Sequence, residues 1–130
     1  MTNVILIVMQ ISDEKFQDLI AEAAEAIAPK YKARMGNVAI LYEDEPTSEQ
    51  REKLALRNDQ TLLGLYEGVP LPARGGATKI LPDKITLFKK PLLNESANLS
   101  ELNENIRHTL WHEVAHYFGL NHERIHELEK

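Results

Sequence analysis

The sequence contains no cysteine among its 130 residues. This absence excludes disulfide bonds, cysteine-ligated zinc fingers and thiol catalysis, and it fits a reducing, cytoplasmic location. A metal ion in this protein would therefore need histidine, aspartate or glutamate ligands. All five histidines lie between positions 108 and 126, so candidate ligands concentrate near the C-terminal end of the sequence.

Long apolar runs and an excess of basic residues are also absent. The longest apolar run, residues 4–9, is far shorter than the roughly 18 residues that suggest a membrane-spanning helix. It has no basic flank and no small-residue cleavage site, so it predicts a buried strand rather than a secretion signal. The net charge is −5, whereas nucleic-acid binding usually requires a basic face. We therefore expect no membrane association and no nucleic-acid partner.

The length and composition predict one domain spanning residues 1–130. A first helix is expected after Ser12, which suits an N-cap, and Pro29 is expected to stop that helix. Residues 43–60 are highly charged. Thr47 and Gln50 have the spacing of a capping box and could begin a short helix there, but the thin apolar stripe fits a mobile surface segment equally well. Three further segments have the character of strands: residues 38–42, 61–66 and 84–89, the last of them closed by Pro91.

The longest predicted helix lies in the C-terminal third of the sequence. Asn98 and Glu101 have capping-box spacing at its start, and it should run to about Phe118. Gly119 suits the left-handed conformation that often follows a helix end. One apolar stripe along this helix is expected to face the core, and its members are Leu99, Leu102, Ile106, Leu110 and Val114.

This helix carries the pattern H-E-x-x-H-x-x-G-x-x-H. His112 and His116 lie one turn apart on one helix face, so their imidazoles can converge on one ion. The turn at Gly119 would bring back His122 as a third ligand. Glu113, beside the first ligand, would act as the general base. By equal-frequency counting, a chain of this length would contain the whole pattern by chance about once in tens of thousands.

Three protein ligands leave the fourth zinc position for water, which is the arrangement of a catalytic site. We expect one Zn²⁺ per chain, with Glu113 deprotonating the zinc-bound water that attacks a peptide carbonyl group. His108 and His126 are interpreted as exposed polar residues rather than ligands. The aromatic residues that flank the motif, Trp111, Tyr117 and Phe118, are interpreted as core packing.

The motif resembles the metzincin pattern, but no methionine follows it and the usual Met-turn is missing. A closer resemblance is to small bacterial zincin-like metallopeptidases, the minimal zincins, and it extends to three more segments: a first helix containing Phe16 before Pro29, residues 62–68 (LLGLYEG) and residues 81–85 (LPDKI). The resemblance implies a zincin-like α+β fold, with a small mixed β-sheet packed against an active-site helix.

The resemblance also implies metal binding by His112 and His116 and a base role for Glu113. The third ligand position is often aspartate in that family, and here it is His122. A peptide or protein substrate is implied, lying along an edge strand, for which residues 85–88 are our candidate. Tyr66 and Arg124 could donate hydrogen bonds to an oxyanion, but we expect Tyr66 to pack under the sheet and Arg124 to pair with a carboxylate near the end of the sequence.

Two alternatives to a peptidase remain open. The first is a metal-dependent endoribonuclease, because the bacterial rRNA-maturation ribonucleases share the H-x3-H-x5-H ligand spacing. That family typically has glycine after the first histidine, where this chain has Glu113. The second is a zinc-binding module without catalytic activity, in which the metal only stabilises the fold.

Overall fold

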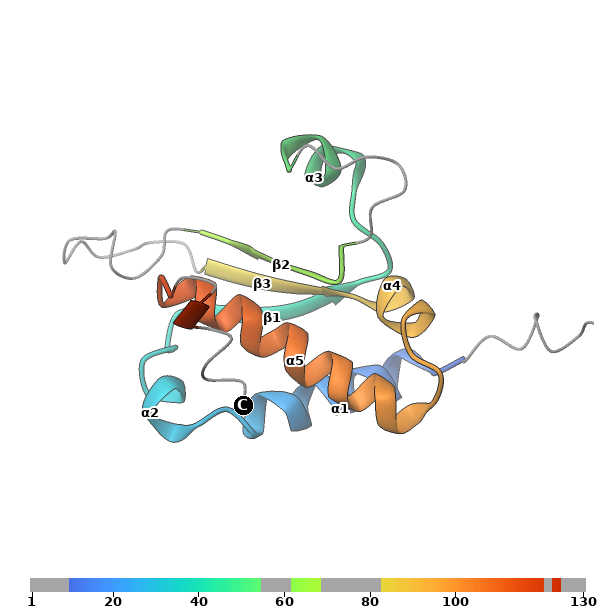
Figure 1. Cartoon of the computed structure of the whole chain (residues 1–130), viewed down its shortest axis with the longest axis horizontal. Helices are drawn as coiled ribbons and strands as arrows, with labels where there is room; N and C mark the ends of the chain where they lie inside the picture. Colours follow the sequence, from blue (N-terminus) through green and yellow to red (C-terminus); the bar gives the residue numbers. More distant parts are fainter. Residues whose placement is uncertain (1–9, 55–61, 69–82, 121–122, 125–130) are drawn as a thin grey trace, which may run out of the picture.

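The computed structural model describes residues 10–54, 62–68, 83–120 and 123–124, so the strand expected at residues 4–9 lies outside them. Two long helices pack beneath a small sheet, and a short helix lies above it (Figure 1). None of the helices in the described part is long and apolar enough to cross a membrane. The elements are α1 (Asp13–Glu25), α2 (Pro29–Lys32), β1 (Val38–Glu43), α3 (Ser48–Lys53), β2 (Gly64–Glu67), β3 (Asp83–Phe88), α4 (Lys89–Asn94) and α5 (Leu99–Tyr117).

The sheet is mixed, with strand order β1-β3-β2. β1 is parallel to β3, with Ile40 opposite Ile85, and β2 is antiparallel to β3, with Tyr66 opposite Ile85. The α+β fold with a small mixed sheet is therefore confirmed. The edge strand proposed at residues 85–88 is wrong, because these residues belong to the central strand and pair on both sides. The two edges of the described sheet are β1 and β2.

Helix α1 begins where its cap predicts. The Ser12 hydroxyl accepts a hydrogen bond from the backbone N–H of Lys15 at 3.1 Å. The helix ends at Glu25, however, and Pro29 begins α2 instead of stopping α1. Proline suits a first helical position because the N–H it lacks would have no partner there. The apolar residues that α1 and its C-terminal extension bury are Phe16, Leu19, Ile20, Ala23 and Ile27.

Pro91, like Pro29, lies at the start of a helix instead of ending the element before it. β3 runs directly into α4, and Pro91 lies in the first turn of that helix rather than closing the strand. The capping box at α3 is confirmed, since Thr47 and Gln50 exchange both hydrogen bonds, at 3.0 and 2.9 Å.

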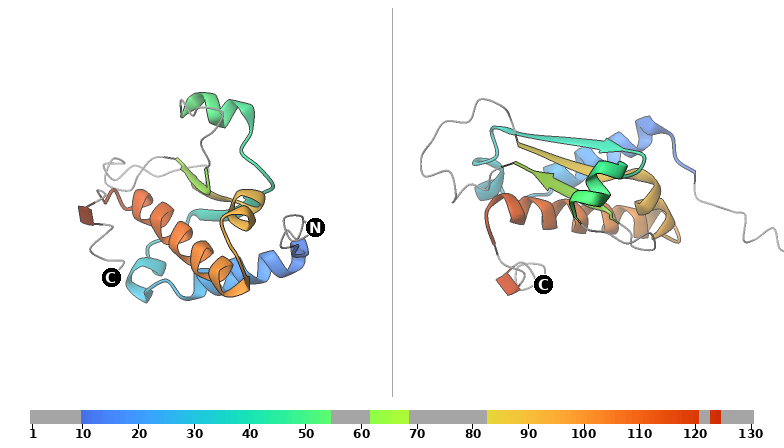
Figure 2. Two further views of the ribbon diagram at one scale, coloured as in Figure 1. Left: turned by 45° about the vertical axis from the view of Figure 1, so that its right-hand side comes forward. Right: turned by 90° about the horizontal axis from the view of Figure 1, so that it is seen from above.

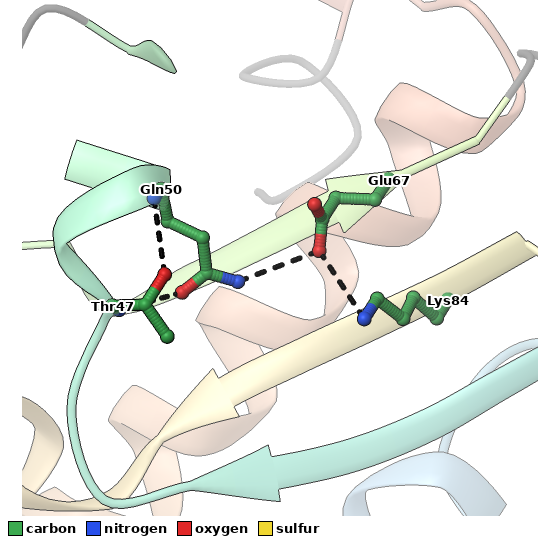
Figure 3. Close-up of polar contacts among 4 residues, drawn as sticks. All are labelled: Thr47, Gln50, Glu67 and Lys84. Carbon is green, nitrogen blue, oxygen red and sulfur yellow. Dashed lines mark hydrogen bonds and ion pairs between the residues drawn. The ribbon is translucent and has the colours of Figure 1, made fainter. Parts of the chain in front are cut away.

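α3 is held over the sheet face that points away from α5. Gln50 Nε2 donates to the Glu67 carboxylate at 3.5 Å, and Lys84 Nζ lies 3.7 Å from the same oxygen (Figure 3). Glu67 and Lys84 alternate with Tyr66 and Ile85, which point into the core, so their side chains lie on the opposite face. This network connects α3 to β2 and β3.

Helix α5 crosses the other face of the sheet beside α1 (Figure 2). Asn98 accepts from the N–H of Glu101 at 2.9 Å, whereas the Glu101 carboxylate accepts from Ala97 at 3.0 Å, so the reciprocal bond is displaced by one residue. Gly119 follows the helix with a φ of 73°, as expected. Four members of the apolar stripe are buried, namely Leu102, Ile106, Leu110 and Val114. Leu99 is 48% exposed, so its assignment to the core was wrong.

Candidate functional site

One face of α5 lies directly against β2. Thr109, Glu113 and Tyr117 follow one another at four-residue spacing and are all buried. A Cβ atom on Gly64 would lie only 2.7 Å from Thr109 Cγ2, so the glycine allows the helix and the strand to approach closely. Farther along both elements, the rings of Tyr66 and Tyr117 meet edge to face at 6.0 Å. Glu113 therefore lies on α5 between two contacts with β2.

The two imidazoles of the motif lie side by side next to this face. The ring centroids of His112 and His116 are 4.6 Å apart, and the ring planes are inclined by 48°. Glu113 Oε1 lies 3.9 Å from His116 Nδ1. Both histidines are half-buried, whereas Glu113 is only 7% exposed. The structure thus brings together three of the four residues predicted for the metal centre.

The fourth predicted residue, His122, lies outside the described residues, as does His126. Within the described ranges no group of three histidine, aspartate or glutamate side chains is arranged to hold a metal ion. His108 is exposed one turn before His112. Arg124 is exposed as well, and its predicted carboxylate partner stays a prediction.

Burial changes the chemistry of Glu113. Loss of solvent raises the pKa of its carboxyl group from 4.5 to about 7, and a hydrogen bond with the backbone of Tyr66 opposes part of that rise. The carboxyl group can therefore exist in both protonation states near neutral pH. Such a group is suited to accepting and returning a proton.

The donor set fits zinc. Two imidazoles, one helical turn apart and with their rings in proximity, offer the nitrogen ligands that zinc prefers. A carboxyl group buried against them supplies a nearby proton acceptor that a closed structural site does not need. His112 and His116 could hold the ion, with His122 as the predicted third ligand.

The register of β2 places main-chain groups at the edge next to this site. Phe88 N donates to Leu63 O at 3.0 Å, so every second residue from Leu63 onward pairs with β3 through its main chain. The main-chain groups of Gly64 and Tyr66 therefore point away from β3. This direction agrees with the hydrogen bond between the Tyr66 backbone and Glu113.

Sequence reasoning assigned no individual role to Asp83, which it noted only within the LPDKI segment. Asp83 is the first residue of β3 and is completely buried. Its Oδ2 accepts a hydrogen bond from the Tyr66 hydroxyl at 2.6 Å. Tyr66 packs against the core, as predicted, and this bond directs its hydroxyl to Asp83. An acidic residue immediately before an apolar strand was the available signal.

The aromatic residues that flank the motif contribute to the core, as expected. Tyr117 is buried, and Trp111 and Phe118 pack against the core cluster. The ring of Tyr31, from α2, lies 5.1 Å from Trp111 and 5.2 Å from Phe118. These contacts hold the C-terminal half of α5 against α2.

The fold and the site define an α+β protein with an H-E-x-x-H helix packed beneath a mixed sheet. A family model described as "Zincin-like metallopeptidase" matches residues 35–130, most of the chain, and the protein belongs to this family. A solved structure, a conserved hypothetical protein from Thermo thermophilus, shares the fold with a TM-score of 0.59 and 19% identity, covering 83% of this chain and 94% of that chain. No curated protein matches the chain.

Proposed function

We propose that this protein is a zinc-dependent peptidase in which His112, His116 and His122 hold one zinc ion and Glu113 is the general base. The observation that carries the proposal is the position of Glu113, which is buried beside two imidazoles and beneath an edge strand. A structural metal site has no need of such a group. Membership of a family described as metallopeptidases supports the same chemistry.

In this proposal the three histidines would bind zinc and Glu113 would transfer protons. Bound at this site, zinc would polarise a peptide carbonyl group and lower the pKa of a water molecule. Glu113 would accept a proton from the attacking water and pass it to the departing amine. The burial of Glu113 limits competing contact between its carboxyl group and bulk water.

An extended peptide substrate would lie along the outer edge that β2 forms in the described part of the sheet. The main-chain groups of Gly64 and Tyr66 point to that edge, and Glu113 lies directly beneath it. This placement replaces the strand at residues 85–88, which is central. Between the two enzymatic alternatives, Glu113 beside the first histidine and the net charge of −5 favour a peptide over RNA.

The test compares zinc content and cleavage among histidine variants. Wild type should retain about one zinc per chain after dialysis and should cleave members of a broad peptide library. His116→Ala and His122→Ala should lose both properties. His108→Ala is the matched control, because His108 lies on the same helix one turn before His112 and should not be needed.

The other outcomes are equally informative. Retention of zinc by His116→Ala would overturn the ligand assignment. Zinc binding by wild type without peptide cleavage would contradict the peptidase and support a non-catalytic zinc module. Cleavage of a structured RNA instead of peptides would support the ribonuclease.

A further inference from the structure

A buried hydrogen bond joins the end of β2 to the start of β3. The Tyr66 hydroxyl donates to Asp83 Oδ2 at 2.6 Å, and Asp83 is 0% exposed. Removing a carboxyl group from water is costly unless hydrogen bonds replace those to solvent. The Tyr66 hydroxyl therefore offsets part of the free-energy cost of burying this carboxyl group.

The same carboxyl group contacts the residue that follows β2. A Cβ atom on Gly68 would lie 2.4 Å from Asp83 Cγ, so only glycine lets the backbone pass so closely. Gly68 also has a φ of 151°, which side-chain-bearing residues rarely adopt. Asp83 thus touches β2 through the Tyr66 hydroxyl and touches the backbone just beyond it. The end of the strand is held at two points.

Tyr66 faces α5 as well as Asp83. Its ring packs on the Tyr117 ring, and its backbone hydrogen-bonds with Glu113, one helical turn before Tyr117. The side chain and the main chain of one residue therefore connect Asp83 to Glu113. A shift of Tyr66 along the strand would change both contacts.

We infer that Asp83 is a positioning residue for the proposed base. Through the Tyr66 hydroxyl it fixes the end of β2, and the Tyr66 main chain in turn fixes the Glu113 carboxyl group. The role of Glu113 as a base rests on the proposed function, but the positioning of its carboxyl group by Tyr66 does not require catalysis. A general base must be held within hydrogen-bonding reach of the proton it accepts, so this restraint would act on turnover rather than on metal binding.

The first experiment measures amide hydrogen exchange in the metal-free protein. Tyr66→Phe removes only the hydroxyl and keeps the ring on Tyr117. Exchange at residue 66 should become faster by about tenfold or more, because its amide is no longer held against Glu113. Exchange at Leu65 and Glu67, whose main-chain groups pair with β3, should remain near wild type.

Tyr117→Phe is the matched control. It removes another buried tyrosine hydroxyl, which donates to Arg34 O at 3.2 Å. It should leave exchange at residue 66 unchanged. Wild-type exchange at residue 66 in Tyr66→Phe, or an equal acceleration in Tyr117→Phe, would overturn the inference and leave the bond a general contribution to stability.

A second pair of variants tests the acceptor. Asp83→Asn keeps a side-chain oxygen for the Tyr66 hydroxyl and should preserve slow exchange at residue 66, whereas Asp83→Ala should accelerate it. If Asp83→Ala does not fold, the comparison of Tyr66→Phe with Tyr117→Phe still decides. Acceleration in Asp83→Asn equal to that of Tyr66→Phe would contradict the acceptor role.

The last measurement links positioning to activity. Zinc-loaded Tyr66→Phe should keep its full zinc content and lose about tenfold in kcat, with KM nearly unchanged, because only the base is displaced. An unchanged kcat would overturn the link to catalysis. If wild type itself cleaves no peptide, the proposed function fails, and the exchange data alone decide whether Asp83 positions Glu113.

Discussion

Glu113 is a glutamate in a place where helices normally bury apolar side chains. It lies between Thr109 and Tyr117 on the face of α5 that packs against β2, and its carboxyl group is shielded from solvent. Burial of an ionised carboxylate is unfavourable, so the native state binds the proton of Glu113 more tightly than the unfolded chain does. This residue therefore makes the stability of the metal-free protein depend on pH.

The direction of that dependence follows from the raised pKa. Burial raises the pKa of Glu113 from an ordinary value of 4.5 to about 7 in the native state. The contribution of its protonation to the free energy of unfolding is therefore complete below pH 4.5 and is lost as the pH rises through 7. Metal-free Glu113→Gln and wild type should be similarly stable near pH 4.5. Above pH 7 the variant should be more stable, by on the order of 3 kcal/mol.

Urea unfolding of both chelator-treated proteins across this pH range measures the difference. Any other group that titrates alike in the two proteins cancels in the comparison. A difference that stays constant between pH 4.5 and 8 would show that Glu113 does not take up a proton on folding in this range.

The residues of the candidate site differ in how far the sequence alone could place them. His112, Glu113 and His116 share one helix, so helical periodicity was enough to predict that the imidazoles lie together. The turn at Gly119 was predictable for the same local reason. Asp83 was not, because its partner Tyr66 is 17 residues away and meets it only through strand pairing.

At the scale of elements, strand order was the least predictable feature. Residues 85–88 were expected at an edge, yet β3 is central. All four residues are buried, although their side chains alternate between the two faces of the sheet. This pattern is typical of a strand that is covered on both faces. Pro29 and Pro91 were predicted to end the preceding elements, but each lies in the first turn of the next helix. The sequence alone does not separate these two positions, because proline is common at both.

The contact between α5 and β2 depends on Gly64, and Gly64→Ala tests it. The added methyl group would lie 2.7 Å from Thr109 Cγ2 and 3.2 Å from Leu87 Cδ2, so the helix and the strand would have to separate. We expect a loss of about 1 to 3 kcal/mol in the free energy of unfolding. Denaturant unfolding measures this loss.

A control variant and a rescue variant test whether the loss comes from this contact. Gly36→Ala is the control, since nothing lies within 4 Å of its added methyl group. Adding Thr109→Ser to Gly64→Ala removes the methyl group that clashes and should recover part of the loss. Equal stability of Gly64→Ala and Gly36→Ala would contradict the close approach.

At the scale of the whole molecule, the core extends beyond the region of the family match. That match begins at residue 35, yet α1 precedes it and contributes the completely buried Phe16 to the same core as Ile85 and Leu110. α1 also packs directly on α5. The helix that carries the candidate site is therefore supported by α1 on one side and by the sheet on the other.

The proposed function requires that α5 present a catalytic base beside a metal. The most direct test is the rate of peptide cleavage by wild type and Glu113→Gln at equal zinc content. Glutamine keeps the size of the side chain but accepts no proton, so cleavage should fall by about 100-fold or more while zinc binding is retained. Cleavage by Glu113→Gln at the wild-type rate would contradict the claim.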